Sequence, residues 1–186
     1  MPVVQSRIFS SDQDLKEFYA KLRITPCPHC KKVGSLIKHG FLRGYDQDHQ
    51  LNKTVRAARV FCSNRKRAQG CGRTFSVWMA DKIKRLFLNA DSLWKFLSQA
   101  VANNNKLDAF RKLNSGLSDS APYRIWKRFL QAQAAIRTAL TGLCEPPQVA
   151  SENPAQLTLA HLQKAFQEHS LSPIAAFGAT LQTFFM

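Results

Sequence analysis

The stretch that decides the fold is "FCSNRKRAQGCGRTFSVW", residues 61–78. It contains two cysteines, Cys62 and Cys71, with eight residues between them. Three basic side chains lie in this gap, Arg65, Lys66 and Arg67, and Arg73 lies two residues after Cys71. The stretch is either half of a metal site whose loop presents positive charge to a partner, or a basic surface loop that contains two unrelated thiols.

A second pair of cysteines lies upstream, in "CPHC" at residues 27–30. A Cys-x-x-Cys turn places two thiolates on one tight knuckle, and Zn²⁺ prefers four thiolate or imidazole ligands in a tetrahedron. The 31 residues between the two pairs are predicted to contain strands, and Gly70 and Gly72 let the backbone fold tightly around Cys71. We therefore predict one structural Zn²⁺ bound by Cys27, Cys30, Cys62 and Cys71.

The small size of the predicted sheet favours this metal. A segment of about 50 residues with few large apolar side chains buries too little surface to be stable alone, and a metal crosslink supplies the missing stabilisation. Four available thiols argue against a catalytic zinc, which keeps one position open for water. Two alternatives stay open: unrelated thiols, or a histidine in place of one cysteine, most readily Cys62. The candidate histidines are His29, His39 and His49. Cys144, in a predicted linker, is interpreted as an incidental thiol.

The chain is strongly basic, with 27 Lys and Arg against 12 Asp and Glu among 186 residues and a formal net charge of +15. Residues 1–90 carry 18 basic and 6 acidic side chains, residues 91–143 carry 8 and 3, and residues 144–186 carry 1 and 3. Such a chain attracts polyanions, and nucleic acid is the first candidate. The surface for that partner is predicted in the first three quarters of the sequence.

The sequence shows neither a secretion signal nor a membrane span. The N-terminus "MPVVQSRIFSSDQDL" lacks an uninterrupted apolar segment, and no apolar run approaches the roughly 20 residues that cross a bilayer. We expect a cytoplasmic protein without a membrane partner. In a reducing compartment disulfides are not expected, and metal binding, catalysis or burial explains the five cysteines better.

Local patterns predict an α+β fold: a small β-rich zinc ribbon, then an all-α helix-turn-helix unit, then a C-terminal helical tail. Ser11 and Asp14, followed by apolar residues at helical spacing, predict a helix over about residues 11–23. After it, "SLIKHGFLRGY", "TVRAARVF" and "RTFSVW" have the composition and breaks of strands.

Beyond residue 80 the apolar period becomes helical. One helix runs through Leu93 and Val101 with Asp91 or Ser92 as its N-cap, and a shorter one ends before "NSGLSDS". A longer helix begins near Ser120, and two more follow "NP" and "SP". The predicted boundaries are an N-terminal helix in 1–25, a zinc ribbon in 26–80, a helix-turn-helix-like unit in 86–143, a linker in 144–156 and a C-terminal helical pair in 157–186.

The longer helix after residue 120 has a basic face. Arg124, Lys127, Arg128 and Gln131 fall at helical spacing, opposite an apolar stripe of Trp126, Phe129 and Ile136. A recognition helix needs this division, because one face packs on its neighbours while Arg and Gln reach phosphates and base edges. The alternative interpretation is an ordinary solvated face.

The segments "CPHC", "HGFLRGY" and "RVFCSNRKRAQGCGRTFS" resemble the N-terminal zinc ribbon of insertion-sequence transposases and their small accessory DNA-binding proteins. In that family a helix-turn-helix region follows the ribbon. The enlarged gap between Cys62 and Cys71 departs from the family pattern. The resemblance implies a role in transposition, DNA recombination or regulation of a mobile element. No counterpart of a transposase catalytic domain is visible in this sequence.

The leading hypothesis is a non-catalytic, zinc-dependent protein that binds double-stranded DNA. The residues expected to contact DNA are Arg65, Lys66, Arg67, Arg73, Arg124, Lys127, Arg128 and Gln131. The nearly uncharged C-terminal helices either complete the core of the helical unit or form an interface with a second copy or a separate transposase or recombinase subunit.

Two other functions compete with DNA binding. RNA binding would use exposed aromatic side chains to stack single-stranded bases, but most aromatic positions here lie on predicted apolar faces. A nuclease would need clustered acids, and Asp46, Asp48 and His49 in "YDQDHQ" form the local cluster. We interpret that stretch as a hairpin turn.

Overall fold

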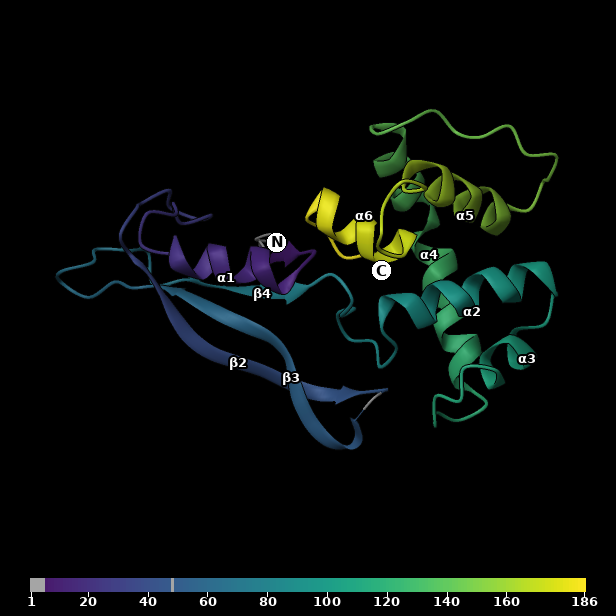
Figure 1. Ribbon diagram of the computed structural model, residues 1–186, viewed down its shortest axis with the longest axis horizontal. Helices are drawn as coiled ribbons and strands as arrows, with labels where there is room; N and C mark the ends of the chain where they lie inside the picture. Colours follow the sequence, from purple (N-terminus) through teal and green to yellow (C-terminus); the bar gives the residue numbers. More distant parts are fainter. Residues whose placement is uncertain (1–5, 48) are drawn as a thin grey trace.

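The computed structural model describes residues 6–47 and 49–186. Over this part of the chain the fold is mixed α+β, with a four-stranded sheet and six helices, which confirms the predicted class. Figure 1 shows two regions along the long axis: a sheet unit (residues 6–79) and a helical unit (residues 90–186). Of the positions proposed above for chemistry, Asp48 lies outside the described residues.

The sheet has the order β1-β4-β3-β2. Its strands are β1 (Ser6–Phe9), β2 (Leu36–Asp46), β3 (His49–Cys62) and β4 (Thr74–Met79). The β2–β3 hairpin and the β3–β4 pair are antiparallel, whereas β1 is parallel to β4. The sequence predicted three of these strands. It did not predict β1, because four residues paired with a strand some 70 positions away leave no local signal.

The helix α1 (Asp12–Ala20) covers one face of the sheet. Its N-cap is Ser11, whose hydroxyl accepts the backbone N–H of Asp14 at 3.1 Å, as the sequence indicated. A small core lies between helix and sheet, made by Phe18, Leu22, Cys27, Leu36, Val60, Cys62, Phe75 and Val77. Two of the cysteines of the predicted metal site are therefore part of this core.

The helical unit contains α2 (Ala90–Ala102), α3 (Lys106–Arg111), α4 (Ala121–Thr141), α5 (Pro154–Ala165) and α6 (Pro173–Leu181). The predicted N-cap of α2 was wrong: Asn89, not Asp91 or Ser92, caps the helix and accepts the N–H of Ser92 at 2.8 Å. The order of long, short and longer helix is as predicted, with residues 112–120 between α3 and α4. No helix in the described ranges has both the length and the apolar content needed to cross a bilayer.

The C-terminal helices are part of the core of the helical unit. Leu162 of α5 and Phe177 of α6 are buried in one cluster with Phe96 of α2 and Phe129 of α4. Trp78 of β4 belongs to the same cluster, so this core continues into the sheet. The segment after α6 packs there too: the ring of Phe184 lies edge-on to the ring of Trp78, with 5.4 Å between the two ring centres.

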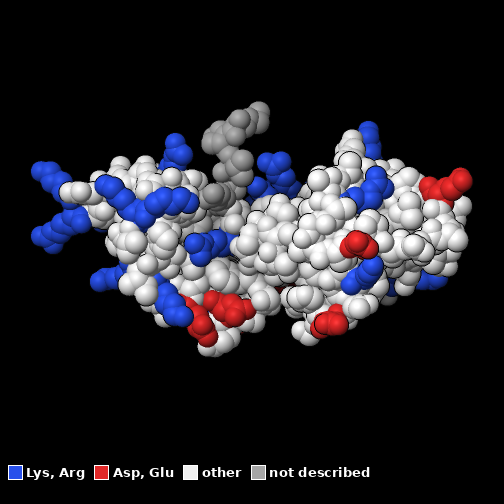
Figure 2. Space-filling model, turned by 90° about the horizontal axis from the view of Figure 1, so that it is seen from above, with Lys and Arg blue, Asp and Glu red and all other residues white. Residues whose placement is uncertain are grey.

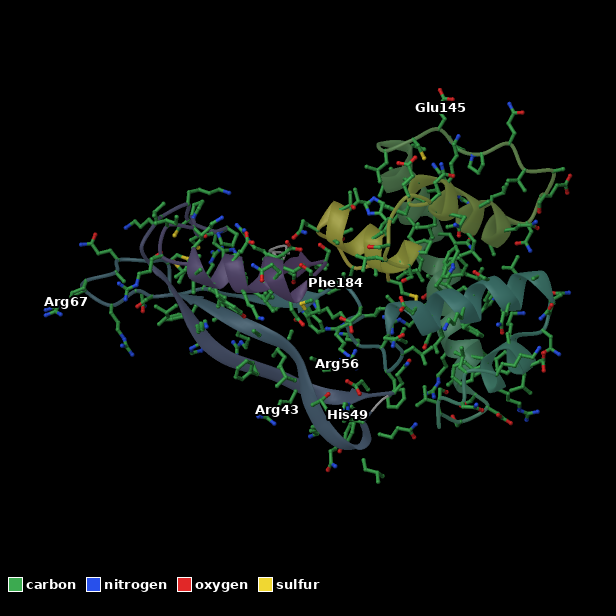
Figure 3. All side chains as sticks on the ribbon, in the orientation of Figure 1. Arg43, His49, Arg56, Arg67, Glu145 and Phe184 are labelled. Atoms are coloured by element: carbon green, nitrogen blue, oxygen red, sulfur yellow. The ribbon has the colours of Figure 1, made fainter. Side chains whose placement is uncertain are left out.

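Polar contacts join the sheet unit to the helical unit and to the segment 80–89 between them. Gln182, in left-handed conformation just after α6, hydrogen bonds the backbone of Ile8 on the outer edge of β1 through both ends of its amide, at 3.0 and 2.7 Å. Arg56 of β3 is buried and donates to the carbonyls of Tyr45 at 2.6 Å, Ile83 at 3.1 Å and Leu86 at 2.8 Å. Arg56 therefore ties the hairpin to the segment that leads into the helical unit (Figure 3).

Candidate metal centre and nucleic-acid interface

The structure brings the four predicted ligands together. The sulfur atoms of Cys27, Cys30, Cys62 and Cys71 all lie within 4.8 Å of one another. Two of the distances are 3.9 Å, from Cys27 to Cys71, and 3.7 Å, from Cys30 to Cys62. A tetrahedron with metal–sulfur bonds of about 2.3 Å has edges of about 3.8 Å, and a disulfide would bring two sulfurs to about 2.05 Å. The spacing therefore fits four thiolates around one metal ion.

The two cysteine pairs lie on turns with matching geometry. In the first turn the N–H of Lys31 donates to the carbonyl of Cys27, and in the second the N–H of Gly72 donates to the carbonyl of Cys62, both at 2.9 Å. The residue after the second cysteine has a positive φ in each turn, 63° at Lys31 and 71° at Gly72. The second turn is therefore built like the first, despite the longer gap between its cysteines.

The extra residues in the second turn fold out as a closed loop. The N–H of Gly70 returns to the carbonyl of Ser63 at 2.6 Å, and the N–H of Cys71 donates to Cys62 Sγ at 3.2 Å. A Cβ on Gly70 would lie 2.5 Å from Cys62 Sγ and still closer to the Ser63 carbonyl, so this position requires glycine. The loop therefore begins and ends beside the sulfur cluster, and the sulfur of Cys62 stays within 4.8 Å of the other three.

The polypeptide stabilises negative charge unevenly over three of the sulfurs, those of Cys27, Cys30 and Cys71. Backbone hydrogen bonding from Lys32 is the main reason that the pKa of Cys30 is lowered to about 7. Burial raises the pKa of Cys27 to about 12 and also raises that of Cys71. Because thiols bind metals as thiolates, a metal ion has to displace protons from Cys27 and Cys71.

The histidines considered as substitute ligands lie outside this group of four sulfurs. His29 is inside the first turn, where its backbone N–H donates to Cys27 Sγ at 3.4 Å. The His39 ring lies 5.2 Å from the Phe61 ring, and His49 Nδ1 is 3.2 Å from Asp46 Oδ1. A site made from the described residues therefore needs no histidine.

The loop between Cys62 and Cys71 presents the basic side chains that the sequence singled out. Arg65, Lys66 and Arg67 are exposed, and so is Arg73 after the loop. The loop closes through a turn in which Ala68 and Gln69 both donate to the Arg65 carbonyl at 2.9 Å. Arg67 marks the outer end of the sheet unit in Figure 3, and Figure 2 shows Lys and Arg projecting at this end. We call residues 63–70 the basic loop.

Only part of the basic face predicted on α4 is exposed. Arg124, Lys127 and Gln131 are exposed. Arg128 is half-buried, and its guanidinium donates to the carbonyls of Arg85 at 3.2 Å and Met186 at 3.3 Å. The basic loop and α4 lie at different ends of the long axis (Figure 1). The structure therefore separates two groups of basic residues that the sequence suggested as one interface.

Asp46, the acidic residue of the hairpin tip that the structure describes, is bonded by its surroundings in the fold. Asp46 Oδ1 accepts the backbone N–H of His49 at 2.9 Å, and Oδ2 accepts the Thr54 hydroxyl at 3.0 Å and lies 3.6 Å from Lys82 Nζ. Burial raises the pKa of this carboxyl, but the hydrogen bonds from Thr54 and His49 and the charge of Lys82 outweigh it, and the pKa is lowered. This geometry fits the interpretation of "YDQDHQ" as a turn.

Sequence reasoning missed two features that bear on function. Phe41 and Tyr45 of β2 are exposed, although aromatic positions were expected on apolar faces. Arg56 and Arg128 were counted among the basic residues, but their guanidinium groups donate to carbonyls of the protein itself. No local signal marks either feature, because each depends on which distant segment covers the residue.

Comparisons with models of known protein families, with curated proteins and with solved structures found no match.

Proposed function

We propose that this protein is a non-catalytic, zinc-dependent DNA-binding protein. The observation that carries the proposal is the sulfur cluster, because it fixes a loop with three exposed basic side chains at the end of the molecule. A loop held on a metal site keeps its charges in place, so binding a polyanion costs less conformational entropy than ordering a free loop.

The chemistry of the four ligands favours zinc. Four thiolates in a tetrahedron suit Zn²⁺ or iron, and soft sulfur ligands exclude Mg²⁺ and Ca²⁺. A site without an open position and partly in an apolar core is typical of structural zinc. Metal analysis of the purified protein should find about one zinc per chain, and an iron site would give a coloured protein instead. A metal content far below one per chain would contradict the proposal.

The proposed DNA contacts come from the basic loop, Arg73 and the exposed part of the α4 face. Lys and Arg on exposed surfaces mainly contact phosphates, which gives affinity with little sequence preference. With about six phosphate contacts, the logarithm of the duplex binding constant should fall with log[salt] at a slope near −5. Binding without salt dependence would contradict an interface of this kind.

A charge-matched comparison tests the basic loop. The triple variant R65A/K66A/R67A should keep its zinc and bind duplex DNA more weakly. Its salt slope should be shallower, because about three phosphate contacts are lost. The control K16A/K21A/R23A removes three exposed charges from α1 and the segment after it, and should change duplex binding much less. Equal losses in both variants would assign the effect to net charge alone.

The resemblance to transposase zinc ribbons supplies the proposed setting, which is transposition or regulation of a mobile element. In this setting the chain would act beside a separate catalytic subunit. The bonding of Asp46 within the hairpin supports a non-catalytic role, because its carboxylate is already engaged by Thr54 and His49. Metal-dependent cleavage of DNA that D46A abolishes would contradict this part of the proposal.

A further inference from the structure

The half of the β2–β3 hairpin nearer its turn carries a group of exposed apolar and basic side chains, which we call the hairpin stripe. It consists of Phe41, Arg43 and Tyr45 on β2 and Lys53 and Val55 on β3. Relative exposure is 62% for Phe41, 49% for Tyr45 and 46% for Val55, and both basic residues are exposed. Single exposed apolar residues are ordinary, but here two exposed aromatic rings lie on one strand with a basic residue between them.

The strand register places the hairpin stripe on one face. Arg43 pairs directly with Val55, and residues two apart on a strand point to the same side. The register shifts between Leu42 and Arg43, but the extra residue there is Arg56 on β3, so β2 keeps its alternation. Phe41 and Tyr45 therefore share the face of Arg43, and Lys53 shares that of Val55. The ammonium of Lys53 lies 5.8 Å from the centre of the Tyr45 ring, which agrees with this assignment. In Figure 3 Arg43 points away from the helical unit.

Among the residues that the structure describes, the charge around the hairpin stripe is positive. Asp46, at the end of β2, is buried, and its bonds to Thr54 and Lys82 turn it away from the stripe. Lys38 lies nearer the base of the same strand, with its ammonium 4.4 Å from the Tyr19 ring. A partner for this surface must accept both flat aromatic rings and positive charge, and nucleobases joined by phosphates have this combination.

We propose that the hairpin stripe binds single-stranded nucleic acid, with unpaired bases stacked on Phe41 and Tyr45 and phosphates held by Arg43 and Lys53. The two rings are four residues apart on an extended strand, roughly 13 Å, so each ring takes a separate base. A duplex buries its base faces in its own stack, so the rings can stack only on unpaired bases. This inference goes beyond the proposed duplex binding and uses different residues.

Fluorescence anisotropy with labelled oligothymidine and oligouridine tests the proposal at one fixed salt concentration. Wild-type protein should bind at least one of these strands, and F41A and Y45A should each weaken that binding about tenfold, because stacking contributes on this order per base. F41Y and Y45F should bind like wild type, since both keep a stacking ring. A preference between the two oligonucleotides tells whether the natural strand is DNA or RNA.

Control variants separate this inference from the proposed function. I24A removes an apolar side chain that is 71% exposed on the segment after α1, and it should leave single-strand binding unchanged. F41A and Y45A should leave duplex binding unchanged, whereas R65A/K66A/R67A should weaken it. Wild-type protein that does not bind single strands, or F41A/Y45A binding them as tightly as wild type, would overturn the stripe proposal and leave duplex binding standing. A dimer by light scattering that F41A/Y45A dissociates would assign the stripe to self-association and also overturn it.

Discussion

The core of the sheet unit and the core of the helical unit differ in size and in composition. Among the described residues, the core beneath α1 has 8 buried members, two of which are cysteines. The core that runs from β4 through the helices has 28. A small apolar core supplies little stability and needs a crosslink, whereas a larger one is stable through burial alone. We therefore expect the metal to stabilise mainly the sheet unit, and apolar packing in the larger core to stabilise the protein as a whole.

Removing the metal should have the largest effect, and it should fall on the sheet unit. The variant C27S/C62S, or wild type with a strong chelator, loses a crosslink whose binding free energy in small zinc domains is about 10 kcal/mol or more. Amide hydrogen exchange should show lost protection in β3 and β4 near Cys62, while α2 and α4 stay protected. Full protection of β3 without metal would show that its core suffices alone.

Truncating a side chain of the larger core should instead lower the stability of the protein and leave the metal site intact. Phe129 is fully buried on α4 and lies between Trp126 and Phe185. F129A should lower the free energy of unfolding by about 3–5 kcal/mol, as measured by denaturant titration, with metal content unchanged. Its neighbour Leu130 is 48% exposed, and L130A should change stability by about 0.5 kcal/mol or less. A loss of metal in F129A would contradict the division between the two cores.

The third test returns to the metal end, at Gly70. In G70A the new methyl would press on Cys62 Sγ and the Ser63 carbonyl, so we expect metal affinity to fall at least tenfold in a competition titration with a chromophoric chelator. G34A is the matched control in the same unit: its Cβ would meet nothing within 4 Å, and it carries only the backbone strain of a positive φ. Similar metal affinity in both variants would contradict the close packing described for Gly70.

The contact between the two units should matter less than either core. Arg56→Met keeps most of the side chain's volume but leaves the carbonyls of Tyr45, Ile83 and Leu86 without this donor. The expected loss is about 2 kcal/mol of unfolding free energy, from the unpaired buried carbonyls. Arg43→Met, on the exposed face of the same hairpin, should cost almost nothing. An equal effect of both changes would mean that Arg56 does not connect the units.

The smallest expected effect is at Asp46 and depends on pH. Its pKa in the folded protein lies below the ordinary value of 3.8, so the ionised carboxylate contributes stability that is fully present above that value. This contribution is lost as the pH falls through the folded pKa. The difference in stability between wild type and D46N should therefore stay near 1 kcal/mol from about pH 7 to pH 5 and shrink below pH 4. A difference that grows on acidification would contradict the lowered pKa.

The helices were largely predictable because their signals are local. Pro154 and Pro173 mark the starts of α5 and α6, and the apolar spacing of α4 identifies its buried side. The cap of α2 was misplaced because Asn89, Asp91 and Ser92 are all good capping residues, and only the path of the preceding chain decides which one caps. The strand β1 could not be predicted, because its partner β4 is distant in sequence.

The sequence by itself determined which atoms can bind a metal and where charge is plentiful. Cys27, Cys30, Cys62 and Cys71 are recognisable by spacing, and glycines beside Cys71 indicate a tight turn, because thiol chemistry and backbone freedom belong to the residues themselves.

Only the tertiary structure decided which basic and aromatic residues face solvent. Arg128 and Arg56 are taken up by distant carbonyls, while Phe41 and Tyr45 stay uncovered because β2 is an edge strand and α1 covers the sheet elsewhere. The physical reason is that burial and hydrogen bonding depend on segments brought together by the fold, and no residue type carries that information alone.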